Sequence, residues 1–323
     1  MKLPLLTRVV VVAALLMLAV PPMLSAAPQN QEGDTIRIGM VNFILGAPYF
    51  VGMAEAVEEE ASYYGNIEVV ITDAGVDVDQ FVEDIESVLA LNVDGVIISA
   101  GPIQPTQAVL DAIASADVPV VLVDRLIEGA EYTSWIGPDN FGIGEQDGAY
   151  IAERLNGHGR LAVLRGGPED NPIGNARTNG MLSAVEPFSA VEVVMAPEFG
   201  GWSTEGGYAL MQALLEEYDD IDAVFCENDS MCLGAQIAIE DAGRSGEMFL
   251  VGVDGQKEAL LQILSGTNYE ATGLNNSDQI GRAAFHRLMA ILAGGAAEAE
   301  TVLPSPLITR ENAVRFYNPD SVF

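Results

Sequence analysis

Carboxylate, guanidinium and amide side chains stand where several apolar stretches of this sequence end. The stretch 118–124 is apolar up to its last residue, Asp124, and Arg125 follows it. A continuous apolar stretch is typical of a strand buried on both faces, and ligands of open α/β sheets bind outside the carboxyl ends of such strands. Asp offers acceptors and Arg a planar fork of donors, so the pair suits a neutral, hydroxyl-rich ligand. This stretch alone is equally compatible with an ion pair at a strand end.

Further polar and aromatic residues collect where other predicted strands end and helices begin. Asp, Asn and Ser at such places also cap helices, and each one taken singly is equally well explained in that way. Asp139, Asn140 and Asp229 favour the capping explanation. A ligand site is favoured by convergence, because the strand ends of two sheets would face a single crevice. The residues are Asn42, Pro48, Tyr49, Phe50, Ser99, Asp139, Asn140, Asp170, Asn171, Trp202, Asn228, Asp229, Asp254 and Asn275.

Three aromatic residues, Tyr49, Phe50 and Trp202, lie near predicted loop–helix junctions and outside the predicted strands. The flat apolar faces of sugars stack on aromatic rings, while their hydroxyl groups meet Asp, Asn and Arg. A concave site with aromatic walls and a few placed polar groups is the usual design for a small ligand. Ordinary core packing is the alternative explanation for each ring.

Motifs for catalysis or metal binding are lacking in the sequence. Its two histidines, His158 and His286, have no plausible nucleophile as a partner, and there is no nucleophile elbow or phosphate-binding loop. Cys226 and Cys232 fit no metal or redox spacing, and both a disulfide and two buried thiols remain open. We therefore expect neither an enzyme nor a bound cofactor or metal.

Charge and the N-terminal residues limit the possible partners and location. The chain has 14 basic and 47 acidic side chains, a formal charge of −33, which would repel nucleic acid. Residues 1–27 have a basic start, a short apolar run and small residues before position 27, which predicts a secretory signal peptide. Residues 28–34 form a polar linker, and no later stretch is apolar enough to predict a transmembrane helix.

Strands and helices alternate regularly after the linker, which predicts parallel sheets covered by helices on both faces. The plan occurs twice, so we expect an α/β protein with two similar doubly wound lobes. Predicted strands are 36–42, 67–72, 95–99, 118–124, 160–164, 191–196, 223–226, 249–253, 271–274 and 307–309. Predicted helices are 48–64, 79–91, 104–116, 140–155, 176–186, 204–217, 230–242, 258–265 and 278–293.

Seven short sequence motifs occur, in the order in which a known family has them, between about Thr35 and Leu307. This region resembles the type I periplasmic sugar-binding proteins of ABC transporters, the group of ribose, xylose and multiple-sugar binders. The motifs are Ala47-Pro-Tyr-Phe50, Val121-Leu-Val-Asp-Arg-Leu-Ile127, Gly137-Pro-Asp-Asn140, Gly166-Gly-Pro-Glu-Asp-Asn171, Phe225-Cys-Glu-Asn-Asp229, Val251-Gly-Val-Asp-Gly255 and Ser277-Asp-Gln-Ile-Gly281.

The resemblance implies a sugar held between stacking aromatic rings and a set of hydrogen-bonding side chains. Asn275 stands where the ribose binder has a glutamine, and Asn175 where it has an arginine contact that Asp170 or Asn171 would replace. These departures argue against assuming ribose. The implied ligand-binding residues are Tyr49, Phe50, Asp124, Arg125, Asp170, Asn171, Asn175, Trp202, Asn228, Asp254 and Asn275.

The resemblance also implies lobe boundaries and partners. One lobe would comprise residues 35–138 and 276–304, the other residues 139–275 and 305–323, with a hinge made of the three crossings. The expected protein is an exported monomer that captures a monosaccharide or polyol, closes around it and delivers it to an ABC permease. The alternative is a ligand-sensing protein that presents its bound state to a membrane chemoreceptor or sensor kinase. A repressor effector domain is disfavoured because no DNA-binding head is evident.

Overall fold

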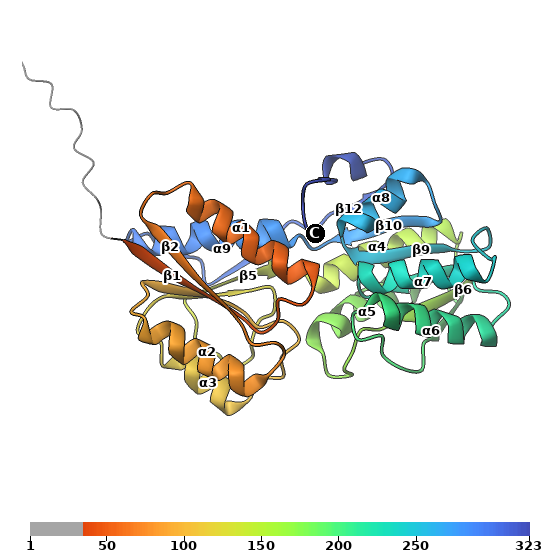
Figure 1. Ribbon diagram of the computed structural model, residues 1–323. Coiled ribbons are helices and arrows are strands. Elements are labelled where there is room, and N and C mark those ends of the chain that lie inside the picture. The colour runs from red at the N-terminus through yellow and green to blue at the C-terminus, as the bar shows by residue number, and fades with distance from the viewer. Residues whose placement is uncertain (1–34) are drawn as a thin grey trace, which may run out of the picture. The chain divides into compact units, whose positions relative to one another are not determined.

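The computed structural model describes residues 35–323, and the predicted signal peptide and linker lie outside the described residues. Residues Thr35–Phe323 form one compact unit that contains two six-stranded sheets, each covered by helices on both faces (Figure 1). The strand orders are β11-β5-β4-β3-β1-β2 and β12-β10-β9-β8-β6-β7. This architecture confirms the predicted class, an α/β protein with two doubly wound sheets.

The first sheet is entirely parallel and is sandwiched between two helix pairs. Helices α1 and α9 pack on one face with Met53, Val57 and Phe285, while α2 and α3 pack on the other with Phe81 and Ile113. The strands are β1 (Ile36–Asn42), β2 (Ile67–Asp73), β3 (Gly95–Ser99), β4 (Val120–Val123), β5 (Ser134–Pro138) and β11 (Glu300–Leu303). The helices are α1 (Pro48–Ser62), α2 (Val78–Ala90), α3 (Gln107–Ala114) and α9 (Ser277–Leu292).

The second sheet repeats this arrangement, except that its edge strand β12 is antiparallel to β10. Helices α4 and α5 cover one face, and α6, α7 and α8 the other. The strands are β6 (His158–Leu164), β7 (Ala190–Met195), β8 (Ala223–Cys226), β9 (Phe249–Asp254), β10 (Tyr269–Leu274) and β12 (Leu307–Thr309). The helices are α4 (Asn140–Arg154), α5 (Pro172–Val185), α6 (Thr204–Glu217), α7 (Asp229–Asp241), α8 (Lys257–Ser265) and the short 3-10 helix η1 (Ala313–Arg315).

Two strands of the first sheet, β5 and β11, were not among the predicted elements. Strand β5 is short and ends in Pro138, and β11 lies at the sheet edge with alternating exposed residues, so neither shows a continuous apolar pattern. Helix α5 begins at Pro172, earlier than predicted, because the side chain of Asn171 caps it and proline suits the first helical position.

The chain passes between the two sheets three times, after β5, after β10 and after β11. Each passage is only a few residues long and lies where a strand of one sheet gives way to an element of the other. These passages hold the carboxyl ends of the strands of both sheets near one another, which determines where a ligand site can form.

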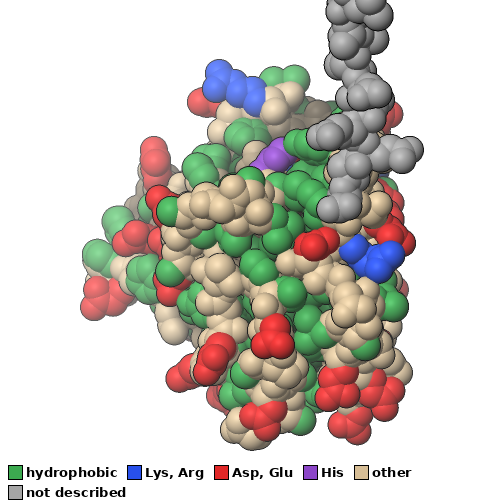
Figure 2. Space-filling model, turned by 90° about the vertical axis from the view of Figure 1, so that its left-hand side faces the viewer, with side chains coloured by type: hydrophobic (Ala, Val, Ile, Leu, Met, Phe, Trp, Pro, Cys, Tyr) green, Lys and Arg blue, Asp and Glu red, His purple; other side chains and the backbone are tan. Residues whose placement is uncertain are grey.

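The surface retains the acidic character of the sequence. Figure 2 shows one face on which acidic side chains are widely spread and basic side chains are few. Among the helices of residues 35–323, none has the length and apolar character that crossing a membrane requires.

Candidate ligand-binding site

A cavity of about 390 Å³ lies between the strand ends of the two sheets. This volume is at the lower end of the range for small-molecule sites. Its apolar wall comes from Ile44, Ala47, Pro48, Tyr49, Phe50, Val76, Pro102, Ile173, Trp202 and Phe323, and its polar lining from Asp124, Asn171, Arg177, Ser203, Asn228, Ser230, Asp254 and Asn275. The lining thus combines aromatic rings with a small number of hydrogen-bonding groups.

Asp124 brings a carboxylate into the cavity from the end of β4. Its backbone N–H donates to the carbonyl of Ile136, its carbonyl accepts from the indole N–H of Trp135, and its own side chain is almost fully buried. Burial raises the pKa of Asp124, although Tyr49 and nearby Arg177 oppose that rise. The backbone is therefore held on both sides, and the carboxylate has a fixed direction.

Tyr49 links the two sheets through its hydroxyl group. The hydroxyl oxygen lies 2.8 Å from Asp124 Oδ1 and 3.1 Å from Asn275 Oδ1, at the passage that follows β10. A single hydroxyl proton can satisfy only one of these acceptors, so the other retains capacity for a ligand. Loss of water and the neighbouring Asp124 carboxylate raise the pKa of Tyr49 well above its usual value.

Asp254 and Arg177 form a buried ion pair on the second sheet. The Arg177 guanidinium lies 3.0 Å from Asp254 Oδ1 and also donates to the carbonyl of Glu227 and to Asn140 Oδ1. Asn275 Nδ2 approaches the same Asp254 oxygen at 3.5 Å. Burial raises the pKa of Asp254 to about 7 in spite of the opposing effect of Arg177.

Arg177 was not among the predicted site residues. It lies within α5, and a single arginine in a helix pattern is ordinarily exposed, yet its side chain is almost fully buried. The sequence signal that could have indicated its burial is spacing. Gly174 lies three residues before Arg177 and Met181 four residues after it, so Arg177 shares a helix face with a small and an apolar residue.

Trp202 forms an aromatic wall on the side of the second sheet. Its indole N–H donates to the carbonyl of Gly167 at 2.7 Å, and its ring covers Gly166. A β-carbon at position 166 would lie only 2.3 Å from the ring, so glycine is required there. Because the indole N–H is already bonded, Trp202 offers the cavity a face and not a donor.

Asn228 both caps α7 and lines the cavity. Its Oδ1 accepts from the N–H of Met231 at 3.0 Å, and its Nδ2 donates to the carbonyl of Trp202 at 3.2 Å. The Nδ2 group has a second hydrogen, which remains for a ligand. The capping and ligand-binding explanations that the sequence left open are therefore compatible at this residue.

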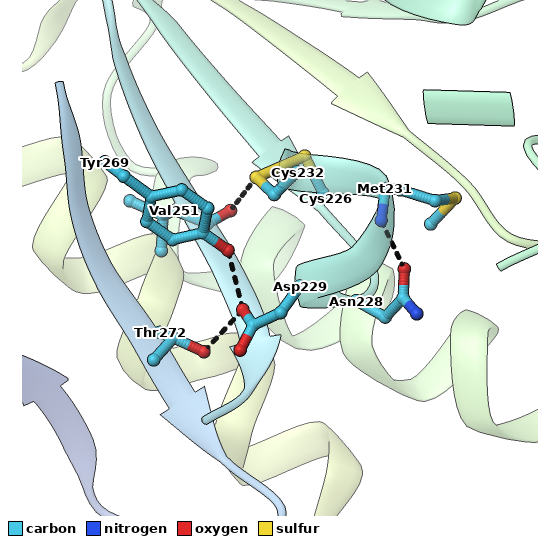
Figure 3. Close-up of a disulfide and its surroundings, with 8 residues drawn as sticks. All are labelled: Cys226, Asn228, Asp229, Met231, Cys232, Val251, Tyr269 and Thr272. Carbon is cyan, nitrogen blue, oxygen red and sulfur yellow. Dashed lines mark hydrogen bonds between the residues drawn. A yellow bond between two sulfur atoms is a disulfide. The ribbon is translucent and has the colours of Figure 1, made fainter. Parts of the chain in front are cut away.

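A disulfide between Cys226 and Cys232 fastens the end of β8 to α7 around Asn228, with 5.4 Å between the Cα atoms (Figure 3). Both cysteines are fully buried. The structure thus decides the alternative between a disulfide and two free thiols in favour of the disulfide. The cross-link limits the movement of the Asn228 segment relative to the sheet.

The Asp229 carboxylate fastens the same helix start to the neighbouring strands. It accepts from the hydroxyl groups of Tyr269 and Thr272, as Figure 3 shows, and from the backbone N–H groups of Gly255 and Gln256. Burial raises the pKa of Asp229 to about 6. The predicted structural role of Asp229 agrees with these contacts.

Unusual backbone conformations concentrate at the cavity. Of the six described non-glycine residues with positive φ, four line it: Val76, Asp124, Trp202 and Asp254. Such conformations cost energy and persist where the surrounding structure enforces them, often at ligand sites. Asp124 and Asp254 occupy equivalent places, each at the carboxyl end of a strand in its own sheet.

The structure brings eight of the eleven predicted site residues into the cavity lining and places three outside it. Arg125 is buried, with Nη1 3.5 Å from the carbonyl of Gly101. Asp170 is exposed and accepts from Gln104 Nε2 at 3.0 Å, and Asn175 is exposed and donates to the carbonyl of Glu169. Of the alternatives Asp170 and Asn171, the cavity includes Asn171.

The family model of the periplasmic binding protein domain matches residues 38–296, so this chain belongs to the periplasmic binding protein family. The match confirms the family that the short sequence motifs indicated.

Three similar proteins illustrate the relationship. The ribose import binding protein of Bacillus subtilis (strain 168) is 28% identical over 90% of this chain and 93% of its own length. A xylitol-binding protein of Mycolicibacterium smegmatis is 25% identical over 87% of this chain and 79% of its own. The solved fructose-binding periplasmic domain of a hybrid two-component system is 30% identical, with a TM-score of 0.78 over 87% of this chain and 92% of its own.

Proposed function

We propose that this protein is an exported solute-binding protein that captures a monosaccharide or related polyol in the cavity between its two sheets and delivers it to an ABC permease. The observation that supports the ligand class most directly is the composition of the cavity. Aromatic side chains line the same cavity as carboxylate and amide groups, and this combination suits a ring with apolar C–H faces and polar hydroxyl edges. The related ribose and xylitol binders point to the same class.

The proposal assigns hydrogen bonding or stacking to particular side chains of the cavity. Asp124 and Asp254 accept hydrogen bonds from ligand hydroxyl groups, Asn228 donates through its free Nδ2 hydrogen, and Tyr49 and Trp202 stack on the ring faces. Arg177 holds Asp254 in place and neutralises part of its charge. Catalysis is not proposed, because these groups are arranged to hold a ligand by hydrogen bonds and because the related proteins are named as binding proteins.

Capture would involve closure of two lobes, residues 35–138 with 276–304 and residues 139–275 with 305–323. The three short passages between the sheets would serve as the hinge. Hinge closure around a ligand is known for periplasmic binding proteins. The hydrogen bond between Gln104 and Asp170 joins loops of the two proposed lobes and would strengthen the closed form. A ligand that binds the closed form better shifts the population towards it.

A second candidate function is ligand sensing, in which the bound state is presented to a membrane chemoreceptor or sensor kinase. The similarity to the fructose-binding domain of a hybrid two-component system supports it. Transport remains the main proposal because the curated relatives include an import binding protein aligned over nearly its full length. The predicted signal peptide at residues 1–27 accords with export in either case.

The test is a thermal-shift screen with pentoses, hexoses, polyols and nucleosides, since a ligand that binds only the folded state raises the melting temperature. We expect a clear rise with at least one sugar or polyol, and no rise at millimolar concentration with any of them would refute the proposal. Asp124→Ala should abolish the rise while the fold is retained. Trp202→Ala should weaken binding by about 0.5–1.5 kcal/mol through loss of a stacking wall.

A further inference from the structure

Residues 318–323, here called the strap, lie against α1 of the first sheet. The ring of Phe323 packs edge-on against Tyr49, with 5.3 Å between ring centroids and an interplanar angle of 85°. A β-carbon at Gly52 would lie 3.2 Å from Phe323 Cβ and 3.5 Å from Val322 Cγ2, so glycine at this helix position makes room for the strap. Figure 1 shows this end of the chain between the two sheets, close to α1.

The strap is also fixed to the second sheet. It follows β12 and η1 along the chain, and η1 packs on α8. At the start of α8, the Lys257 ammonium donates to the carbonyl of Ser321. Within the strap, the Phe323 N–H donates to the Ser321 hydroxyl at 3.2 Å. A short segment anchored on one sheet therefore rests on a helix of the other.

Phe323 is at the same time part of the cavity wall. Tyr49 stands between Phe323 and Phe50, with ring centroids 5.3 Å and 5.2 Å away respectively, so the three rings form a continuous aromatic surface. The Tyr49 hydroxyl reaches Asp124 and Asn275, and the position of its ring therefore sets the geometry of two polar groups. Phe323 can act on a ligand directly as a wall and through Tyr49.

We propose that Phe323 is a ligand-contacting residue and that the strap determines the size of ligand the cavity accepts. This inference rests on the proposed binding of a monosaccharide or polyol. The ring of Phe323 covers part of the apolar surface of that ligand, and its removal opens the cavity on the side of α1. The strap is anchored on the second sheet and rests on α1 of the first sheet. The cavity wall that includes Phe323 is therefore complete only when the two sheets are close together.

The affinity test uses Phe323→Ala, with Val314→Ala as the matched control because Val314 is an exposed apolar residue of η1 outside the cavity. Binding of D-ribose, D-xylose, D-fructose, xylitol and myo-inositol is measured by titration calorimetry. For each ligand that binds the original protein, we expect Phe323→Ala to weaken binding about 10-fold and Val314→Ala to leave it unchanged. The variant should also gain relative affinity for the O-methyl derivative of that ligand, since the lost ring leaves space for the added group.

A second test does not depend on any ligand. In the double variant Gly52→Cys with Phe323→Cys, the two β-carbons lie close to the separation that a disulfide requires. We expect this cross-link to form under mild oxidation and to appear in the masses of proteolytic fragments. Val314→Cys with Gly52→Cys is the control, and it should not cross-link.

The outcomes separate the two proposals. Binding by the original protein with equal affinity and equal selectivity in Phe323→Ala overturns the role of Phe323 and leaves the proposed function standing. Failure of the Gly52–Phe323 cross-link overturns the docking of the strap. If none of the five probes binds the original protein, the ligands found by the thermal-shift screen replace them in the affinity test, and a screen without any such ligand refutes both the proposed function and the role of Phe323 in it.

Discussion

At the scale of single residues, the cavity is notable for carboxylates that are buried yet only partly neutralised. Asp124 and Asp254 enter it from the two sheets, and one guanidinium, that of Arg177, lies 3.0 Å from Asp254. Burial of a charge is costly unless partners compensate, and the raised pKa values of both carboxyl groups express this cost. Ligand hydroxyl groups would supply the hydrogen bonds that water provides in the unfolded chain.

Asp254 makes stability depend on pH in a defined direction. Its pKa is about 7 in the folded protein and near 4 when unfolded, so between these values the folded chain holds a proton that the unfolded chain has lost. The contribution of Asp254 to the unfolding free energy is therefore most favourable below pH 4. It declines as pH rises from 4 to about 7 and is constant above pH 7. Asp254→Asn should remove a slope of up to about 1.4 kcal/mol per pH unit in this window.

Urea unfolding at pH 4.5, 5.5, 6.5 and 7.5 measures this effect as the difference in unfolding free energy between the original protein and Asp254→Asn. The unfolding free energy of Asp254→Asn should increase relative to that of the original protein as pH rises. Parallel stability curves across the whole window would show that the Asp254 carboxyl group is not strongly perturbed.

At the scale of elements, strand ends and helix starts are fixed to one another around the cavity. The disulfide joins β8 to α7 across Asn228, and the Asp229 carboxylate joins the start of α7 to β10 and to the residues after β9. Several side chains therefore cap a helix and face the cavity at once. This dual use explains why helix capping and ligand binding could not be told apart from residue types.

The disulfide should contribute modestly to stability and more to the position of Asn228. The loop between Cys226 and Cys232 is short, with a sequence separation of six, and loop-entropy estimates give about 2 kcal/mol for such a cross-link. We expect Cys226→Ala with Cys232→Ala to lower the unfolding free energy by about this amount and to weaken ligand binding. Unfolding and titration calorimetry test both effects, and unchanged affinity would contradict a positioning role.

The hydrogen bond between Gln104 and Asp170 joins loops of the two proposed lobes, so it should slow ligand release. Gln104→Ala should raise the dissociation rate about 2- to 5-fold, as expected for one exposed hydrogen bond of 0.5–1 kcal/mol. Gln107→Ala is the matched control, because Gln107 makes the same type of bond to Asp111 within α3. Stopped-flow measurements should show the control unchanged, and equal rates in both variants would argue against the closing role.

At the scale of the whole molecule, the dominant property is a large excess of acidic over basic side chains, 47 against 14. Like charges on a compact surface repel one another, and salt screens them over a Debye length of about 10 Å at 0.1 M. The fold must therefore tolerate a repulsive surface at low ionic strength. The buried ion pair of Arg177 with Asp254 is much less affected by this screening.

Salt should therefore stabilise the protein as a whole. We expect the melting temperature at pH 7.5 to rise steadily as sodium chloride increases from 10 mM to 500 mM. Sucrose at matched osmolality separates charge screening from general exclusion effects. A melting temperature that falls with salt would mean that favourable ion pairs outweigh repulsion.

The sequence by itself determined the architecture and the kinds of residue at the site. Regular alternation of apolar stretches with helical patterns is a local property, and it predicted two helix-covered sheets as well as carboxylates, amides and aromatic rings at the strand ends. Family membership also followed from short motifs that each lie within one junction. Eight predicted site residues line the cavity because strand ends of parallel sheets necessarily meet at one edge.

Only the tertiary structure decided which of these side chains face one another. The places of Arg177, Phe323 and Arg125, the Cys226–Cys232 disulfide and the strands β5 and β11 depend on contacts between segments far apart in the chain. Local periodicity carries no information about such contacts. Phe323 shows this most clearly, since its sequence neighbours form no regular element, and only its packing on α1 makes it a wall of the cavity.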